Sequence, residues 1–214
     1  MKDLRAVRGA SLIHTLIAQG EHEHQDFKFA ISDARKIARS ISAFANNDGG
    51  RLLIGVKDNG VVAGVRNEED IYVVEQAAER YCRPAVPVEF KGYKVDGTLL
   101  VIVAEIAASA DRPVMASEPD GTWRAYYRVA DENIAAHPLM VEAWRRSSRA
   151  VAFGSLHGAV VAFVGAAETP VEIRDIALGL HVSTLRAEDT VADLAASGLL
   201  RFVYHRGTFR IIGY

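Results

Sequence analysis

The segment from Gln25 to Val65 constrains the fold most strongly, because its hydrophobic period changes from that of a strand to that of a helix and back. Gln25–Phe29 alternates polar and apolar residues, as a half-buried strand does. Ser32–Ala45 places apolar residues on one helical face, with Ser32 as the expected N-cap. Asn46–Gly50 then ends the helix, and the apolar run Leu52–Val56 predicts a buried strand. We therefore expect a domain that combines helices with a mixed sheet.

Local signals place further elements on both sides of this segment. An earlier helix has its apolar residues within Leu12–Ile17. Asn59-Gly60 is a strong hairpin signal, which makes Val61–Val65 the expected partner of Leu52–Val56. Asn67 is the expected cap of a third helix. Three more strands and a closing helix complete this module: Val88–Tyr93, Thr98–Ile106, Trp123–Val129 and Pro138–Arg146.

The last part of the chain has a different order of predicted elements. An apolar helix over Leu156–Val164 and a second helix that starts at Thr169-Pro170 precede a third helix, which Ser183 caps. A hairpin then turns at Arg206-Gly207. Three helices followed by a hairpin are typical of a winged helix-turn-helix. We predict an α+β fold with two domains, residues 1–146 and 150–214, joined by a short polar linker.

Composition excludes several classes of protein. The 214 residues carry 25 Lys and Arg against 27 Asp and Glu, so any nucleic-acid binding has to use local basic patches. Cys82 is the only cysteine, which excludes an intrachain disulfide framework and a cysteine-rich zinc site. We find neither a signal peptide nor an apolar run of about twenty residues, so we expect a cytoplasmic protein with no membrane partner.

An ordered set of short motifs gives the first module a family resemblance. The motifs are Gly20-Glu21, Asp26-Phe27-Lys28, Ser42–Asn46, Gly49-Gly50, Leu53–Val56, Asp58-Asn59-Gly60 and Tyr127-Arg128-Val129. Over residues 11–136 the chain resembles the Schlafen AlbA-type domain family, whose members are described as nucleic-acid-binding and as divergent ATP-binding proteins. The resemblance implies a protein that binds DNA or RNA, and transcriptional regulation is one form of that function.

Three acidic residues match the metal-dependent site of those Schlafen proteins that have ribonuclease activity. The matching positions are Glu21, Asp26 and Asp58, and Asp26 stands where the family usually has Glu. Clustered carboxylates are ligands for Mg²⁺ or Mn²⁺, and a bound metal activates water for phosphodiester cleavage. The resemblance thus implies a metal-dependent ribonuclease as an alternative function. The same residue types also suit a solvated loop, the polar face of a strand and a turn.

Basic and aromatic residues are candidates for contact with a nucleic acid. The candidates for phosphate contact are Lys28, Arg35, Lys36, Arg39, Lys57 and Arg128. An ordinary solvated helix face is the alternative for the basic residues after Ser32. Trp123, Tyr126 and Tyr127 are candidates for stacking on bases, with core packing as the alternative.

The run Asn46–Gly50 is a candidate phosphate-binding loop. Asn46, Gly49 and Gly50 would form it, because glycines let backbone amides approach a phosphate closely. The alternative is a sharp turn from helix to strand. Since the chain has no Gly-x-x-x-x-Gly-Lys-Ser/Thr motif, an adenine nucleotide would bind here without a P-loop.

The tail leaves two functions open. Its expected recognition helix carries Arg186 together with three acidic residues, and its hairpin carries Arg206. Since acidic residues repel phosphates, DNA contact and protein docking stay alternatives. Related eukaryotic proteins hold two such lobes in one chain, so by analogy a homodimer would supply the second lobe here, with Phe209–Ile212 as the candidate contact.

Overall fold

The computed structural model describes residues 6–65 and 69–214, so the predicted cap Asn67 lies outside the described residues. The chain divides into two compact units, Met1–Ala135 and Ala136–Tyr214. Helices and strands occur together in the described residues, which confirms the α+β prediction. None of the helices in the described ranges has the length and apolar character that a membrane span requires.

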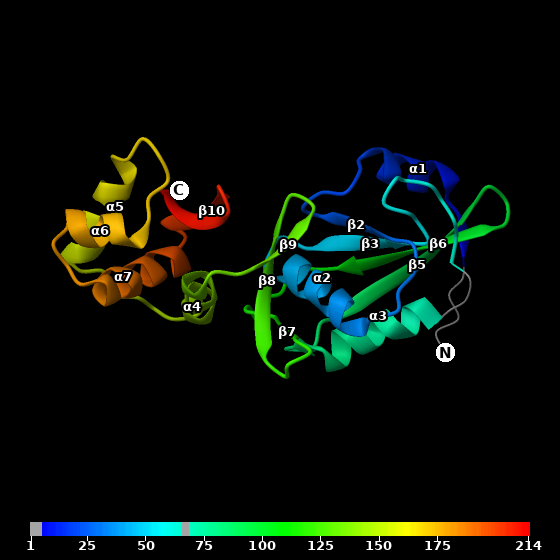
Figure 1. Ribbon diagram of the computed structural model, residues 1–214, viewed down its shortest axis with the longest axis horizontal. Coiled ribbons are helices and arrows are strands. Elements are labelled where there is room, and N and C mark those ends of the chain that lie inside the picture. The colour runs from blue at the N-terminus through cyan, green and yellow to red at the C-terminus, as the bar shows by residue number, and fades with distance from the viewer. Residues whose placement is uncertain (1–5, 66–68) are drawn as a thin grey trace. The chain divides into compact units, whose positions relative to one another are not determined.

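A five-stranded mixed sheet forms the centre of the first unit, in the order β1-β5-β6-β3-β2 (Figure 1). Its strands are β1 (Val7–Arg8), β2 (Gln25–Lys28), β3 (Gly50–Ile54), β5 (Val88–Val95) and β6 (Leu99–Ile106). β2 and β3 run parallel because the helix α2 (Ala34–Asn46) crosses between them. β5 and β6 form the predicted antiparallel hairpin, which turns at Asp96 and Gly97, both with positive φ.

Helices cover both faces of this sheet (Figure 1). On one face, α1 (Ala10–Ala18) packs Ile13 and Leu16 against Phe27 of β2 and Leu53 of β3. On the other face, α2 and α3 (Glu69–Arg80) enclose the larger core. The predicted cap of α2 is wrong by one residue: Asp33, not Ser32, caps the helix, because its carboxylate accepts the first free backbone N–H groups.

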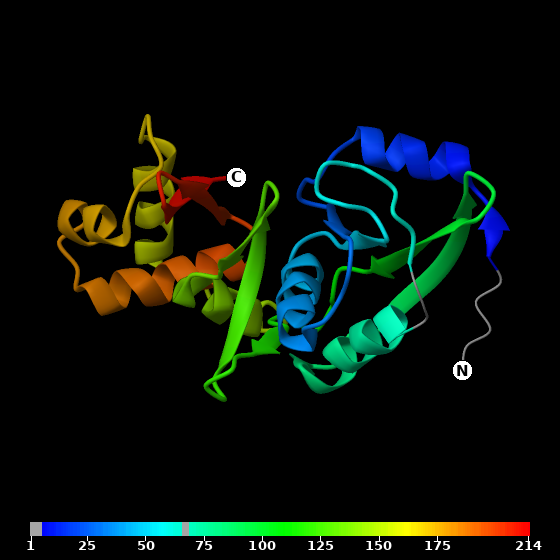
Figure 2. The same cartoon turned by 45° about the vertical axis from the view of Figure 1, so that its right-hand side comes forward.

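A second sheet, antiparallel and in the order β4-β7-β8-β9, completes the first unit. Its strands are β4 (Cys82–Arg83), β7 (Met115–Ser117), β8 (Trp123–Val129) and β9 (Glu132–Ala135). Figures 1 and 2 both show α2 between this sheet and the five-stranded sheet. The Asn46 side chain fixes α2 there, because its Nδ2 donates to the carbonyls of Val114 and Tyr126, each at 2.9 Å.

One predicted strand is wrong. Val61–Val65 does not extend into a strand, and only Val62 forms a bridge, with Val56. The carbonyl of Gly55 instead accepts the N–H groups of Ala63 and Gly64, and both glycines have positive φ. The backbone therefore turns away from the sheet, and β3 takes β6 as its antiparallel neighbour.

The second unit consists of four helices and a hairpin within its described residues. They are α4 (Pro138–Arg146), α5 (Ser155–Gly165), α6 (Ile173–Gly179), α7 (Thr184–Ala196), β10 (Leu200–His205) and β11 (Thr208–Gly213). Ser183 caps α7 as predicted, since its Oγ accepts the N–H of Arg186. The predicted first domain includes α4, but α4 packs on α7 inside the second unit, where Arg146 of α4 contacts Asp189 and Asp193, each at 2.8 Å.

Candidate nucleic-acid interface

The first turn of α2 presents two exposed cations. Arg35 and Lys36 follow the cap Asp33, so both side chains project from the solvent-facing side of the helix. Neither forms an ion pair with any residue in the described part of the chain. The Arg35 guanidinium carbon lies 4.8 Å from the centre of the Tyr81 ring, which orients the side chain without neutralising its charge. These two predicted residues therefore carry uncompensated positive charge.

Arg39, one turn further along α2, has an anionic partner. Its Nε donates to Glu118 Oε1 at 3.1 Å, and its Nη2 contacts the second carboxylate oxygen. Glu118 also accepts the Tyr126 hydroxyl at 2.5 Å. Burial opposes ionisation of Glu118, but these two donors outweigh it and lower the pKa of the carboxyl. Arg39 is therefore largely neutralised, and Tyr126 is a core residue and not an exposed stacking surface.

Arg128 requires a correction, because its side chain is only 1% exposed. Its Nε donates to the His22 carbonyl at 3.3 Å, its Nη2 to the Gln25 carbonyl at 3.2 Å and its Nη1 to Asn133 Oδ1 at 3.0 Å. The guanidinium is thus used inside the first unit and cannot reach a phosphate backbone. A surface position is expected from the sequence because arginine usually lies at the surface.

Two of the three predicted acidic residues lie together. The Glu21 and Asp26 carboxyls share a hydrogen bond, and Glu21 Oε1 also accepts the Phe27 N–H at 2.8 Å. Burial and the neighbouring Asp26 raise the pKa of Glu21. Burial opposes ionisation of Asp26, but the bond from Glu21 and the Lys28 and Arg128 charges lower its pKa. Glu21 is therefore the carboxyl of the pair that takes up a proton first as the pH falls.

The environment of this acidic pair does not fit the predicted metal site. Lys28 Nζ lies 2.7 Å from Asp26 Oδ2, so the Asp26 carboxylate already forms an ion pair with the Lys28 ammonium group. Asp58 lies exposed in the turn before Gly60. In residues 6–65 and 69–214 no group of three or more His, Cys, Asp or Glu side chains is arranged to hold a metal ion. The ribonuclease function stays a prediction.

Lys57, the neighbour of Asp58, is exposed and has no ion pair among the described residues. Its Nζ lies 5.2 Å from the centre of the exposed Phe29 ring, which follows β2. Among the predicted phosphate contacts, Lys57 is therefore a third exposed residue without an ion pair in the described part of the chain, while Lys28 is paired with Asp26.

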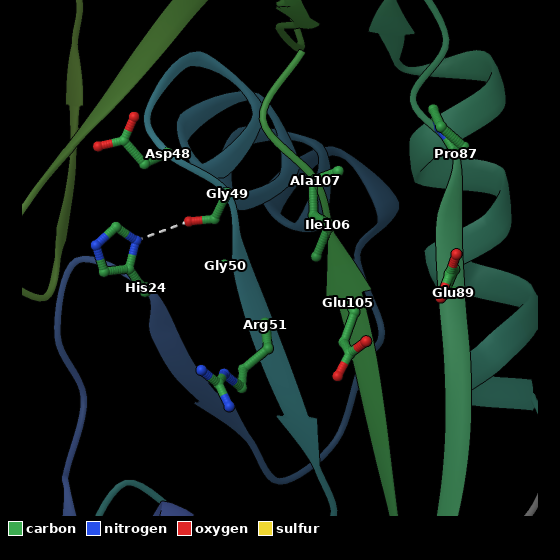
Figure 3. A pocket seen from close by; sticks show the side chains of 10 residues that line it. All are labelled: His24, Asp48, Gly49, Gly50, Arg51, Pro87, Glu89, Glu105, Ile106 and Ala107. Carbon is green, nitrogen blue, oxygen red and sulfur yellow. Dashed lines mark hydrogen bonds between the residues drawn. The ribbon is translucent and has the colours of Figure 1, made fainter.

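The predicted phosphate-binding loop borders a hollow of about 600 Å³ (Figure 3). Figure 3 shows His24 bonded to the Gly49 carbonyl on one side and Glu89 and Glu105 on the other. The Gly49 N–H donates to the Phe44 carbonyl, so it is not free for a phosphate. The loop also follows the C-terminal end of α2, where the helix dipole is negative. This geometry supports the sharp turn that the sequence left as the alternative.

The two glycines of this turn have packing roles. Gly49 has φ +82°, and a Cβ there would lie 2.8 Å from the Ile106 carbonyl oxygen. A Cβ on Gly50 would overlap the Phe44 ring. Both positions thus need glycine for the passage from α2 into β3.

Sequence reasoning missed Arg83. Its guanidinium carbon lies 4.1 Å from the centre of the Trp123 ring, and Arg83 has no ion pair among the described residues. The pair forms because β4 and β8 both flank β7 in the second sheet. In the sequence only Trp123 stands out, as a stacking candidate, and no local signal connects it with Arg83.

In the second unit, Arg186 and Arg206 are both exposed. Of the acidic residues on α7, Asp189 and Asp193 form ion pairs with Arg146, and His157 Nε2 lies 3.5 Å from Asp193. The acidic charge that argued against DNA contact is therefore partly compensated within the unit. Phe209–Ile212, the candidate dimer contact, includes the buried Ile211, which forms a bridge with Val171.

Several solved structures are similar to part of this chain, and two of them are described here. The crystal structure of the DIP2311 protein from Corynebacterium diphtheriae is 21% identical, with a TM-score of 0.43 over 66% of this chain and 29% of that chain. This chain therefore spans less than a third of that protein's length. The solution structure of the N-terminal domain of a putative ATP-dependent DNA helicase RecG-related protein from Nitrosomonas europaea is 19% identical, with a TM-score of 0.38 over 70% of this chain and 97% of that domain. No curated protein was found to match the chain.

The family comparison covers more than half of the chain. The model of the family described as Schlafen, AlbA_2 matches residues 21–137. This range contains the acidic pair, all of α2 and both sheets except β1. The chain belongs to the Schlafen AlbA_2 family.

Proposed function

We propose that this chain is a nucleic-acid-binding protein whose phosphate contacts lie on the first turn of α2. One observation carries the proposal: Arg35 and Lys36 are exposed and have no ion-pair partner among the described residues, although the chain as a whole is slightly acidic. Unpaired cations on one helix turn attract the phosphate backbone without reference to base sequence. Membership of the Schlafen AlbA_2 family supports the same function.

The surface extends beyond this turn. Arg83 and Arg124 are exposed on the neighbouring second sheet, and neither is ion-paired within the described ranges. Arg39 contributes less charge because Glu118 neutralises it. The proposed surface is therefore narrower than the helix face expected from sequence and reaches from α2 toward β4 and β8.

We also propose that the second unit is a winged helix and that the protein regulates transcription. The order of α5, α6 and α7 before the β10–β11 hairpin supports this proposal. The ion pairs of Arg146 reduce the repulsion that α7 would exert on phosphates. Contact of Arg186 and Arg206 with DNA would then follow, and loss of duplex affinity in a variant with both arginines changed to glutamine is the test.

Fluorescence anisotropy tests the main proposal. Labelled single strands and duplexes of DNA and RNA should bind weakly, and their affinity should fall as salt rises. In an Arg35→Gln/Lys36→Gln variant the slope of log affinity against log salt should become shallower, by about 0.7 to 0.9 for each phosphate that the variant no longer neutralises. Arg8→Gln/Lys94→Gln is the matched control, because these two exposed cations lie side by side on β1 and β5.

Two outcomes contradict the proposal. Absence of binding to every nucleic acid at low salt would remove the function itself. Equal loss in the control and test variants would show a general effect of net charge and would remove α2 as the site. The ribonuclease alternative has a separate readout, which is RNA cleavage that requires Mg²⁺ or Mn²⁺ and disappears in Glu21→Gln.

A further inference from the structure

Two pairs of an exposed arginine and an aromatic ring lie in the first unit, one between α2 and the residue before β4, the other between β4 and β8. Arg35 lies over the Tyr81 ring at 4.8 Å, and Arg83 lies over the Trp123 ring at 4.1 Å. Both arginines are exposed and both rings are half-exposed. We call these four residues the stacking row.

Strand pairing places Tyr81, Arg83 and Trp123 near one another, and Arg35 reaches the Tyr81 ring from α2. The N–H of Ser117 donates to the Tyr81 carbonyl at 2.9 Å, and Ser117 is the register partner of Trp123. Tyr81 and Arg83 flank Cys82, which is buried with its Sγ 3.6 Å from the Ala38 carbonyl oxygen. Because alternate residues of a strand point to opposite sides, Arg83 projects away from the core, whereas Tyr81, which precedes the strand, packs against the core and is half-exposed. Each pair of the stacking row therefore offers an exposed arginine beside a half-exposed ring.

No anionic side chain competes for these arginines within the described residues. Arg35 and Arg83 have neither an ion pair nor a side-chain hydrogen bond among the residues that the structure describes. The N–H donors of each guanidinium are thus available to a ligand, while its plane is already oriented by a ring. This arrangement offers flat faces and positive charge at the same place.

We propose that the stacking row binds unpaired bases, so that the first unit prefers single-stranded nucleic acid to a duplex. The inference rests on the proposed nucleic-acid-binding function and specifies its substrate class. In a duplex the base faces are covered by neighbouring bases, whereas a single strand exposes them to aromatic and guanidinium planes. Phosphate contacts by Arg35 and Lys36 would hold either form, but only a single strand would gain from Tyr81 and Trp123.

The experiment compares three ligands at low salt, with the full chain in an Arg186→Gln/Arg206→Gln background so that these two arginines of the second unit add no duplex affinity. The three ligands are a mixed-sequence single strand, the same strand as a duplex, and an abasic strand that has the phosphates but lacks bases. Anisotropy should show tighter binding of the base-containing single strand than of the other two. Trp123→Leu should weaken that binding by about fivefold to about a hundredfold and leave the abasic strand unchanged.

Matched variants separate stacking from folding. Tyr72→Leu removes an aromatic side chain that is 61% exposed on α3, and it should leave all three affinities unchanged. Arg83→Gln keeps the indole but removes its cationic partner, so it should also weaken binding of the base-containing strand. In a Trp144→Phe background, Trp123 is the only indole, and its fluorescence should be quenched by the single strand.

The outcomes distinguish base stacking by the stacking row from the proposed nucleic-acid binding as a whole. Equal affinity for the base-containing and abasic strands, or tighter binding of the duplex, would overturn the stacking row while nucleic-acid binding stands. Unchanged affinity in both Trp123→Leu and Arg83→Gln would overturn it as well. Binding of none of the three ligands would overturn the proposed function together with the inference.

Discussion

Arg128→Met tests the conclusion that a buried arginine joins the two sheets of the first unit. Methionine keeps much of the apolar stem but removes every donor of the guanidinium. The carbonyls of His22 and Gln25 and the Asn133 side chain each lose a hydrogen bond of 3.0 to 3.3 Å. Asp26 loses a cation 3.6 Å away. The two carbonyls keep the backbone N–H groups that they already accept, so the change removes three hydrogen bonds and one charge contact from this part of the first unit.

The expected loss in the free energy of unfolding is about 3 to 5 kcal/mol at neutral pH. Each of the three lost hydrogen bonds contributes on the order of 1 kcal/mol, and removing one member of a buried charge pair costs about 3 to 5 kcal/mol. Lys28 stays 2.7 Å from Asp26 and limits the electrostatic part. An Asp26→Asn/Arg128→Met cycle should therefore give a coupling of only about 1 to 2 kcal/mol.

Urea unfolding followed by Trp123 fluorescence measures this loss, in a Trp144→Phe background because Trp144 lies in the second unit. Arg124→Met is the matched control, since Arg124 lies on the same strand, is exposed and should cost less than about 0.5 kcal/mol. A loss below about 1 kcal/mol for Arg128→Met would refute the structural role of the guanidinium, because one hydrogen bond alone contributes about that much.

The pH dependence of this loss has a defined sign. The folded-state pKa of Asp26 is lowered, so its ionised form contributes stability above the unfolded pKa of about 3.9, and that contribution disappears as pH falls through the folded pKa. Arg128 is one of the charges that lower this pKa. The difference between the wild type and Arg128→Met should therefore shrink when unfolding is measured below about pH 4. A difference that grows in acid would contradict the assignment.

Three further predictions concern stability. Gly50→Ala should lower the free energy of unfolding in urea by about 1 to 3 kcal/mol, because the new methyl group overlaps the Phe44 ring of α2. Its control, Gly158→Ala, lies inside α5 with open space around it and should raise the free energy of unfolding. Arg146→Gln should destabilise the second unit by about 1 to 3 kcal/mol, as followed by Trp144 fluorescence, because Arg146 is only 18% exposed and pairs with Glu142, Asp189 and Asp193. Arg145→Gln changes a residue that is 56% exposed and should have little effect; equal effects of the two variants would contradict the role of Arg146 in joining α4 to α7. The folded-state pKa of Glu21 is raised, so ionisation of this residue removes stability as pH rises. Glu21→Gln should therefore be more stable relative to the wild type at pH 7 than at pH 4, as measured by thermal unfolding. The opposite trend would contradict the raised pKa of Glu21.

Features that depend on neighbouring residues could be predicted from the sequence. The hairpin turns at Asp96-Gly97 and Arg206-Gly207 have positive φ. Asp and Gly favour this conformation, whereas Arg206 adopts it beside Gly207 without such a preference. Ser183 caps α7, and the parallel crossing from β2 to β3 follows the predicted strand–helix–strand pattern. Local propensity is enough in these cases because the interacting groups are close in the chain.

Features that depend on distant partners could not be predicted. Val61–Val65 has the composition of a strand, but β6 supplies the antiparallel partner of β3. The Arg128 side chain is buried where it donates hydrogen bonds to the carbonyls of His22 and Gln25, which lie about a hundred positions earlier in the sequence. The pairing of Arg83 with Trp123 likewise needs the register of β7, which no single segment encodes.

The C-terminal end of α2 is part of the packed core, whereas its N-terminal end is exposed, and this difference allows binding to be tested separately from folding. At its C-terminal end, Asn46 and Ser42 hydrogen-bond to the second sheet and its preceding loop and are buried. At its N-terminal end, Arg35 and Lys36 are exposed and make no ion pair in the described residues. Changes at the N-terminal end therefore alter charge without removing buried hydrogen bonds, and surface changes of this kind cost less than about 0.5 kcal/mol. Loss of nucleic-acid affinity in the Arg35→Gln/Lys36→Gln variant, with an unchanged unfolding midpoint, would thus report on the interface itself and not on the fold.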